Sequence, residues 1–141
     1  MINATDLMLG NWVKGPIGSY LQVNNVNAEY VGVSYTIDRI GCSEHIEVEK
    51  IWPIPLTQHL MELIGWSLPK YQYFPHGEGA GTVTYVPEPK KRTFVGLTFV
   101  LKDWGVRKKG DIVFGNKVIE FLHELQNIYR WETGTPLDIT L

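Results

Sequence analysis

A basic segment, residues 90–109, is the part of the sequence whose residue types best fit binding chemistry. It holds seven basic residues and one acidic residue, with Trp104 among them. Basic side chains with an interleaved aromatic ring are what a nucleotide or a single-stranded nucleic acid requires. The candidate ligand-binding residues are Lys90, Lys91, Arg92, Trp104, Arg107, Lys108 and Lys109. The alternative is a strand bounded by solubilising charges, which also protect it from pairing at its edge.

Aromatic residues form a second candidate site. Tyr71, Tyr73 and Phe74 crowd a proline-flanked stretch, and His76 follows in a glycine-rich turn. Because aromatic side chains are enriched among the anchors of interfaces, these four residues could form an interaction surface. Packing in the core is the alternative for the three aromatic rings.

Motifs for catalysis or metal binding are incomplete in this sequence. Gly77, Gly79 and Gly81 precede a strand pattern rather than a helix, which favours a hairpin loop over a phosphate cradle. The four histidines stand singly, and the start of an H-E-x-x-H motif at His123 fails because position 127 is asparagine. His123 is expected to be a buried structural residue. A Cys42–His45 nucleophile pair would need spatial contact and a third, orienting group. We therefore expect no metal, no cofactor and no catalytic residue.

Composition predicts one soluble domain. The chain has 141 residues, 44% of them apolar, a net charge of −2 and one cysteine. A chain of this length usually forms one domain, and its short apolar runs exclude a membrane-spanning helix. The first residues lack the basic and apolar regions of a signal peptide, and one cysteine cannot form an internal disulfide. We expect a cytoplasmic protein of a reducing cytosol that does not bind membranes.

The first part of the chain, residues 1–52, reads as a β subdomain. Strand patterns cover 11–13, 20–23, 30–37 and 45–51, with turns at 15–19, 24–27 and 41–43. Short strands at this spacing predict a curled antiparallel sheet of the SH3-like or OB-like kind. Trp12, Trp52 and Trp66 adjoin predicted elements and are expected in the core.

The remainder, residues 53–141, reads as an α+β part of the same domain. Pro53 and Pro55 fix an extended connector, after which Thr57 is a natural N-cap for a short helix. Leu60, Leu63 and Ile64 share one face of that helix. The predicted elements are a helix at 58–64 ending at Gly65, strands at 82–86, 93–101 and 111–114, a helix at 117–131 ending at Gly134, and an edge strand at 137–140. The long helix places Val118, Phe121, Leu122, Leu125, Ile128 and Tyr129 on one stripe, which we expect to cover the second sheet.

Three segments together resemble a known family. They are Leu7–Val13, then Pro53–Thr57 followed by Gly65-Trp66, and then Phe121–Tyr129 followed by Thr133-Gly134. In this order they resemble a family of short uncharacterised proteins encoded by phages, prophages and mobile elements of Bacteroidetes, which reads IGNWV, PIPLT and LHQLQNLY…LTG. The resemblance implies an origin, and with it a bacterial host cytosol as the compartment, but it carries no catalytic residues. Most of its motif residues have a structural explanation, but Gln126 and Asn127 do not, and at least one of these amides is expected to bond neighbouring backbone, as a cap on a sheet edge.

These observations favour a non-enzymatic accessory protein of a phage or mobile element that acts by binding. Its partner would be a host or phage protein, and the chain could form a homo-oligomer. The alternative is a protein that binds or sequesters a nucleotide or nucleic acid through the basic segment. A hydrolase using His76, or Cys42 with His45, is a third hypothesis that no motif recommends.

Overall fold

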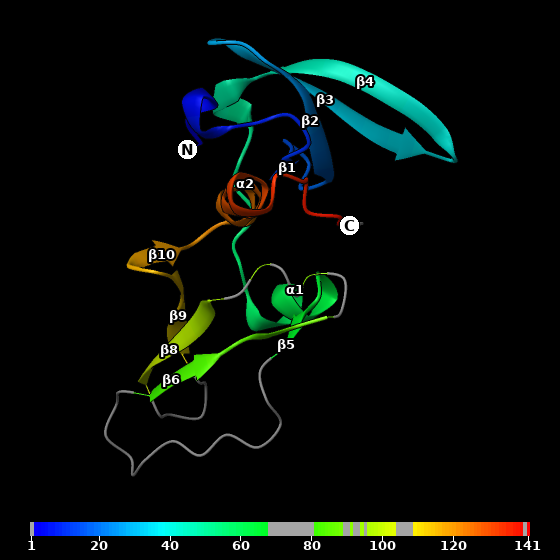
Figure 1. The fold of residues 1–141 in the computed structure, drawn as a ribbon. Coiled ribbons are helices and arrows are strands. Elements are labelled where there is room, and N and C mark those ends of the chain that lie inside the picture. The colour runs from blue at the N-terminus through cyan, green and yellow to red at the C-terminus, as the bar shows by residue number, and fades with distance from the viewer. Residues whose placement is uncertain are drawn as a thin grey trace. The chain divides into compact units, whose positions relative to one another are not determined.

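The computed structural model describes residues 2–67, 81–88, 91, 94, 96–103, 109–139 and 141. Two compact units make up this part of the chain (Figure 1). The first unit takes Met1–Pro55, Phe121–Ile139 and Leu141, and the second takes Leu56–Glu120. The predicted α+β class is confirmed, with two antiparallel sheets, a short helix and a C-terminal helix.

A four-stranded antiparallel sheet is the centre of the first unit. Its strands are β1 (Trp12–Lys14), β2 (Tyr20–Val26), β3 (Tyr30–Ile37) and β4 (Ile40–Glu47), in the order β1-β2-β3-β4. Short 3₁₀ helices, η1 (Ala4–Asp6) and η2 (Val48–Lys50), flank it. Asp38 and Arg39 both have positive φ, 48° and 66°, which is the backbone of the two-residue turn that suits a twisted hairpin. The turn therefore lies before Ile40, and the predicted turn at 41–43 is wrong because Cys42 belongs to β4.

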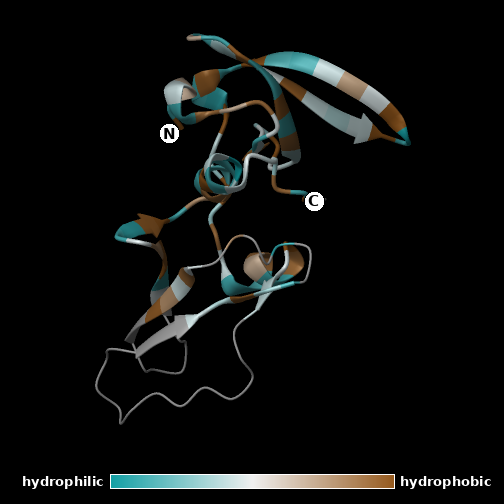
Figure 2. Ribbon diagram, in the orientation of Figure 1, coloured by the Kyte–Doolittle hydropathy of each residue, from teal (hydrophilic) through white to brown (hydrophobic). Residues whose placement is uncertain are grey.

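One face of this sheet supplies the core of the first unit. On β2, Leu21 and Val23 are buried at alternate positions. Figure 2 shows hydrophobic and hydrophilic bands along β4. The core residues are Ile2, Leu7, Val13, Leu21, Val23, Val31, Val33, Ile46 and Ile51. Trp12 is half-buried, and the prediction that Trp52 is in the core is wrong, because its side chain is 45% exposed.

The C-terminal helix, α2 (Leu122–Thr133), is shorter at its start than predicted. A tight turn at Gly115-Asn116 sends Lys117–Ile119 back along the preceding strand as β10, so Val118 lies in a strand and not on the helix. The helix starts only where Glu124 Oε1 accepts the Phe121 backbone N–H at 3.1 Å. It ends as predicted at Gly134, whose φ of 74° lets its N–H reach Arg130 O.

Helix α2 belongs to the first unit, and its two amides cap the outer edge of β1. Gln126 Oε1 accepts the Trp12 N–H at 2.8 Å, and Gln126 Nε2 donates to Gly10 O at 3.1 Å. Asn127 accepts from Asn11 Nδ2 at 2.9 Å and donates to Asp6 O at 2.8 Å. The prediction that an amide of this pair bonds backbone at a sheet edge is confirmed. The expected place of the helix over the second sheet stays a prediction.

The second unit is built on another antiparallel sheet, in the order β10-β9-β8-β6. Its strands are β6 (Gly81–Thr84), β8 (Leu97–Asp103), β9 (Lys109–Phe114) and β10 (Lys117–Ile119), and a separate pair joins β5 (Trp66–Ser67) to β7 (Val86–Pro87). Trp66 and Phe94 are buried edge to face, with ring centres 5.9 Å apart. Residues 137–139 form no strand, and the predicted edge strand is therefore absent there.

The short helix α1 (Gln58–Leu63) is capped as predicted, since Thr57 Oγ1 accepts the Leu60 N–H at 3.1 Å. Leu60 and Ile64 are buried, but Leu63 is 66% exposed and does not share their face. None of the helices in the described part of the chain is long and apolar enough to span a bilayer.

The cap on β1 makes Gln126 a stability determinant. Gln126→Leu keeps the side chain's bulk but leaves the Trp12 N–H without its partner, while Gly10 O keeps the hydrogen bond from Gln22 Nε2 at 3.2 Å. We therefore expect the free energy of unfolding to fall by about 1–3 kcal/mol. Urea denaturation followed by circular dichroism measures this loss. Glu132→Leu, on an exposed position of the same helix, is the matched control and should change stability by about 0.5 kcal/mol or less. Equal effects of the two substitutions would contradict the capping role.

Candidate interaction surface of the first unit

The two edges of the first sheet differ in how they are covered. The edge at β1 is occupied, because Gln126 bonds Trp12, and Lys14 and Trp52 exchange two backbone hydrogen bonds of 2.8 and 2.9 Å. Among the described residues, the edge at β4 has β3 as its single neighbour in the sheet. In this part of the chain, the open side of the sheet is therefore the side of β4.

A groove of about 910 Å³ lies at the hairpin end of the same sheet. Residues from all four strands, the loop after β1 and Leu141 line it. Its apolar and aromatic lining consists of Trp12, Pro16, Ile17, Tyr20, Leu21, Tyr35, Ile37 and Leu141. Ile17 is 91% exposed and Ile37 is 55% exposed, so apolar surface stands open to solvent here. Exposed apolar patches of this kind mark binding sites more often than isolated apolar residues do.

The polar lining of the groove is nearly free of charge. Gln22, Ser34, Thr36 and Ser43 supply neutral donors and acceptors, and Glu44 is the charged member of the lining. The Glu44 carboxylate raises the pKa of the Tyr35 hydroxyl, and desolvation adds to the shift in the same direction. Tyr35 is therefore a neutral phenol throughout the physiological range. The groove offers hydroxyl, amide and aromatic groups, which fits a neutral polypeptide segment better than a phosphate.

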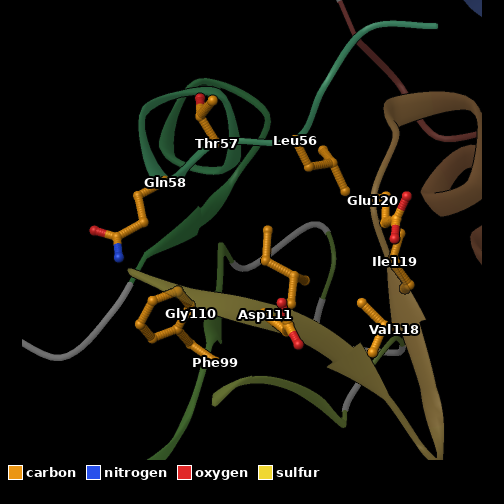
Figure 3. Close-up of a pocket in the computed structure, with 10 residues that line it drawn as sticks. Leu56, Thr57, Gln58, Phe99, Gly110, Asp111, Val118, Ile119 and Glu120 are labelled. Carbon is orange, nitrogen blue, oxygen red and sulfur yellow. The ribbon is translucent and has the colours of Figure 1, made fainter. Parts of the chain in front are cut away.

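A second hollow lies within the second unit, between the start of α1 and the β9–β10 hairpin (Figure 3). It measures about 580 Å³, and its lining includes the carboxylates of Asp111 and Glu120 with Thr57 and Gln58. Because its charged lining among the described residues is acidic, it does not suit a nucleotide phosphate.

Most residues of the two predicted sites lie outside the described residues. These are Lys90, Arg92, Trp104, Arg107 and Lys108 of the basic segment, and Tyr71, Tyr73, Phe74 and His76 of the aromatic segment. Lys109 begins β9, and Lys91 is the member whose side chain the structure describes. Whether the basic groups gather at one place stays a prediction.

Lys91 is a buried structural cation. Its side chain is 8% exposed, its Nζ lies 2.7 Å from Glu88 Oε1, and it sits 5.6 Å from the centre of the Trp66 ring. Gly65, with φ of 108°, leaves room for this pair, since a Cβ there would come within 2.9 Å of Lys91 Nζ. The charge of Lys91 is thus neutralised inside the second unit, and Lys91 cannot serve as the exposed ligand contact that its sequence position suggested.

The other candidate residues have structural places. His123 is 4% exposed on α2, as predicted. Cys42 and His45 are three residues apart on β4, so their side chains point to opposite faces and form no catalytic pair. Within the described part of the chain, no group of three His, Cys, Asp or Glu side chains is arranged to hold a metal ion.

Comparison with known proteins identifies no relative of this chain. No protein-family model matches it, and neither curated proteins nor solved structures give a significant match. The resemblance to the phage-encoded family therefore stays a prediction. Function has to be argued from the groove and the sheet edges themselves.

The groove residues were not singled out from the sequence. The sequence does contain a signal for this groove. Tyr35 and Ile37 on β3, and Ile40 on β4, continue the apolar alternation beyond the residues that form the core. Extra apolar residues at a hairpin end predict either a longer core or an exposed apolar surface, and periodicity alone does not distinguish the two.

The Lys91–Glu88 pair leads to an asymmetric prediction. Glu88→Ala would leave the buried Lys91 ammonium without the Glu88 carboxylate, so the free energy of unfolding should fall by about 2 kcal/mol. Lys91→Met keeps the packing on Trp66, and the Glu88 side chain is 44% exposed and stays hydrated, so the free energy of unfolding should fall by less than about 1 kcal/mol. Urea denaturation of both variants measures the difference, and a larger loss for Lys91→Met would contradict this account.

Tyr85 gives a prediction for alkaline pH. Its ring is 3% exposed, its hydroxyl bonds no described residue, and burial followed by the charge of Glu62 raises its pKa to about 12. Between pH 10 and 12 the unfolded chain loses this proton before the folded chain does, so stability should fall as pH rises through that window. Thermal unfolding at a series of alkaline pH values should show this fall in the native chain and a smaller one in Tyr85→Phe. An identical fall in both would exclude Tyr85 as its source.

Proposed function

We propose that this chain is a non-enzymatic accessory protein of a phage or mobile element that acts by binding a segment of another protein. The observation that supports this proposal is the open groove of about 910 Å³ on the first unit, with its exposed apolar and aromatic lining. The origin is inferred from the resemblance in the sequence, and the mode of action is inferred from the groove.

The chemistry of the lining specifies the bound segment. Aromatic rings such as Tyr20 and Tyr35 provide flat apolar contact, while Ser34 and Gln22 provide neutral hydrogen-bonding groups beside them. A segment with two or three apolar side chains separated by neutral polar residues would satisfy both. A basic residue near Glu44 would add charge complementarity at one end.

Peptide selection tests this proposal directly. A displayed library of random peptides, panned against the purified chain, should yield apolar sequences that bind it. Tyr20→Ala and Ile37→Ser, at exposed positions of the groove, should each weaken that binding about tenfold or more, since truncating a central contact costs over 1 kcal/mol. Trp131→Ala is the matched control, because its side chain is 87% exposed but lies on α2, outside the groove lining.

Ionic strength separates this function from its alternative. Apolar binding in the groove should change little with salt, whereas binding of nucleic acid to the basic segment should weaken steeply as salt is raised. Selected peptides that bind equally well to the groove variants and to the native chain would refute the proposal. A steeply salt-dependent hit with short DNA or RNA would favour the basic segment instead.

A further inference from the structure

Within the described part of the chain, the outer edge of β4 has no bulge, proline, lysine or covering element that would keep it from pairing. Natural edge strands are protected by bulges, prolines, inward-pointing charges, lysines on the edge or a covering element. Strand β4 contains neither lysine nor proline, and its register with β3 runs without a shift over eight residue pairs. The β1 edge of the same sheet is capped by Gln126 and Trp52. The contrast between the capped β1 edge and the uncapped β4 edge indicates that β4 is available to pair with another strand.

The register defines which backbone groups this edge offers. Along an antiparallel ladder, residue pairs alternate between those that exchange hydrogen bonds and those whose backbone groups point outward. The two-residue turn at Asp38-Arg39 closes on the Ile37–Ile40 pair, which makes that pair a hydrogen-bonded one. The outward residues of β4 are then Gly41, Ser43, His45 and Glu47. None of their backbone groups makes a further hydrogen bond to a described residue.

The side chains of β4 are complementary to a second, antiparallel copy of β4. When Ser43 faces Ser43 of the second copy, Ile40 lies beside Ile46 and Arg39 lies near Glu47. Each pair occurs twice by symmetry. Ile40, 67% exposed in the single chain, would thereby cover the end of a residue that already belongs to the core. Apolar and oppositely charged pairs across strands both stabilise such a ladder.

Neighbouring registers lack this match. Pairing Ser43 with His45 places Glu44 against Glu44 of the second copy, and like charges in direct opposition destabilise a sheet. Pairing Gly41 with itself places Asp38 against Glu44. Pairing Gly41 with Ser43 places Ile40 against Glu44. The Ser43-centred register alone combines the apolar pair with the ion pair.

We infer that two copies of this chain associate through their β4 edges, antiparallel and centred on Ser43, to form one continuous eight-stranded sheet. The interface is two-fold symmetric, which is the commonest arrangement of protein dimers. The paired segment of β4 shares Ser43 and Glu44 with the groove lining, whereas Tyr20 and Ile37 of the groove lie outside the paired residues. Loss of peptide binding in Tyr20→Ala or Ile37→Ser with an intact dimer therefore separates the failure of the proposed function from the failure of this inference.

Sedimentation of a proline variant tests the edge. The native chain should sediment as a concentration-dependent dimer, and Ser43→Pro should be monomeric, because proline removes the outward N–H that the second strand needs. The same N–H makes no bond to β3, so the thermal midpoint should stay close to the native value. Ser43→Ala keeps the N–H and should stay dimeric. A monomeric native chain, or a dimer that survives Ser43→Pro, would overturn the inference.

Cysteine scanning tests the register. In a Cys42→Ser background, Ser43→Cys should form an intermolecular disulfide under mild oxidation, because opposed Cα atoms lie about 5.5 Å apart. Gly41→Cys is the matched control, as its counterpart lies several residues away in this register. Crosslinking at position 41 in place of 43 would refute the Ser43-centred pairing.

Charge exchange gives an independent readout of the same register. Glu47 also lies 3.7 Å from Lys50 Nζ of its own chain, a contact that is present in monomer and dimer alike. Glu47→Arg should raise the dimer dissociation constant about tenfold, because it replaces the two attractions between Arg39 and Glu47 across the dimer with repulsion. The double variant Glu47→Arg with Arg39→Asp should return the dissociation constant most of the way to the native value. Arg39→Asp alone should raise the dissociation constant. Equal dissociation constants for all three variants would contradict the predicted contact.

Discussion

The first unit depends on one side-chain amide, that of Gln126. Its oxygen and nitrogen satisfy a backbone N–H and a backbone C=O at the outer edge of β1, at 2.8 and 3.1 Å. An amide can do this because it carries a donor and an acceptor side by side, as a peptide group does. Helix α2 thus takes the place of a fifth strand. Leu122 and Leu125 of the same helix are fully buried.

This cap determines which edge of the sheet can accept a further strand. With β1 covered by Gln126 and Trp52, any chain that extends the sheet has to do so at β4, and the groove opens at the hairpin end near the same strand. The second unit shows a different use of polar groups. There Lys91 and Glu88 form an ion pair in the space that Gly65 leaves, with the Lys91 ammonium over the Trp66 ring. A cation from the most basic part of the sequence thus serves packing.

Local signals in the sequence predicted local features well. The Thr57 cap, the helix end at Gly134 and the burial of His123 follow from short-range rules that need no partner. The start of α2 was misplaced because the apolar stripe continues through Val118, while the Gly115-Asn116 turn makes a hairpin more favourable there. The exposure of Trp52 and the burial of Lys91 depend on neighbours distant in sequence, which no periodicity encodes. The amide cap was anticipated as a type of contact, but its receiving strand was not.

The hydrogen bond between Trp12 and Gln126 joins residues 114 positions apart in the sequence. Along the chain, the residues of the second unit come between the two main segments of the first. Contacts of such long sequence separation form late, since the entropy of closing the loop is lost before they contribute. On the ribosome, strands β1 to β4 emerge first, yet the helix that covers β1 is made last. For most of the time of synthesis the nascent sheet therefore has two open edges, and it is during that interval that mispairing with other chains is easiest. Folding of the second unit in the meantime would shorten the loop, because it brings residues 55 and 121 to adjacent positions on one bridge.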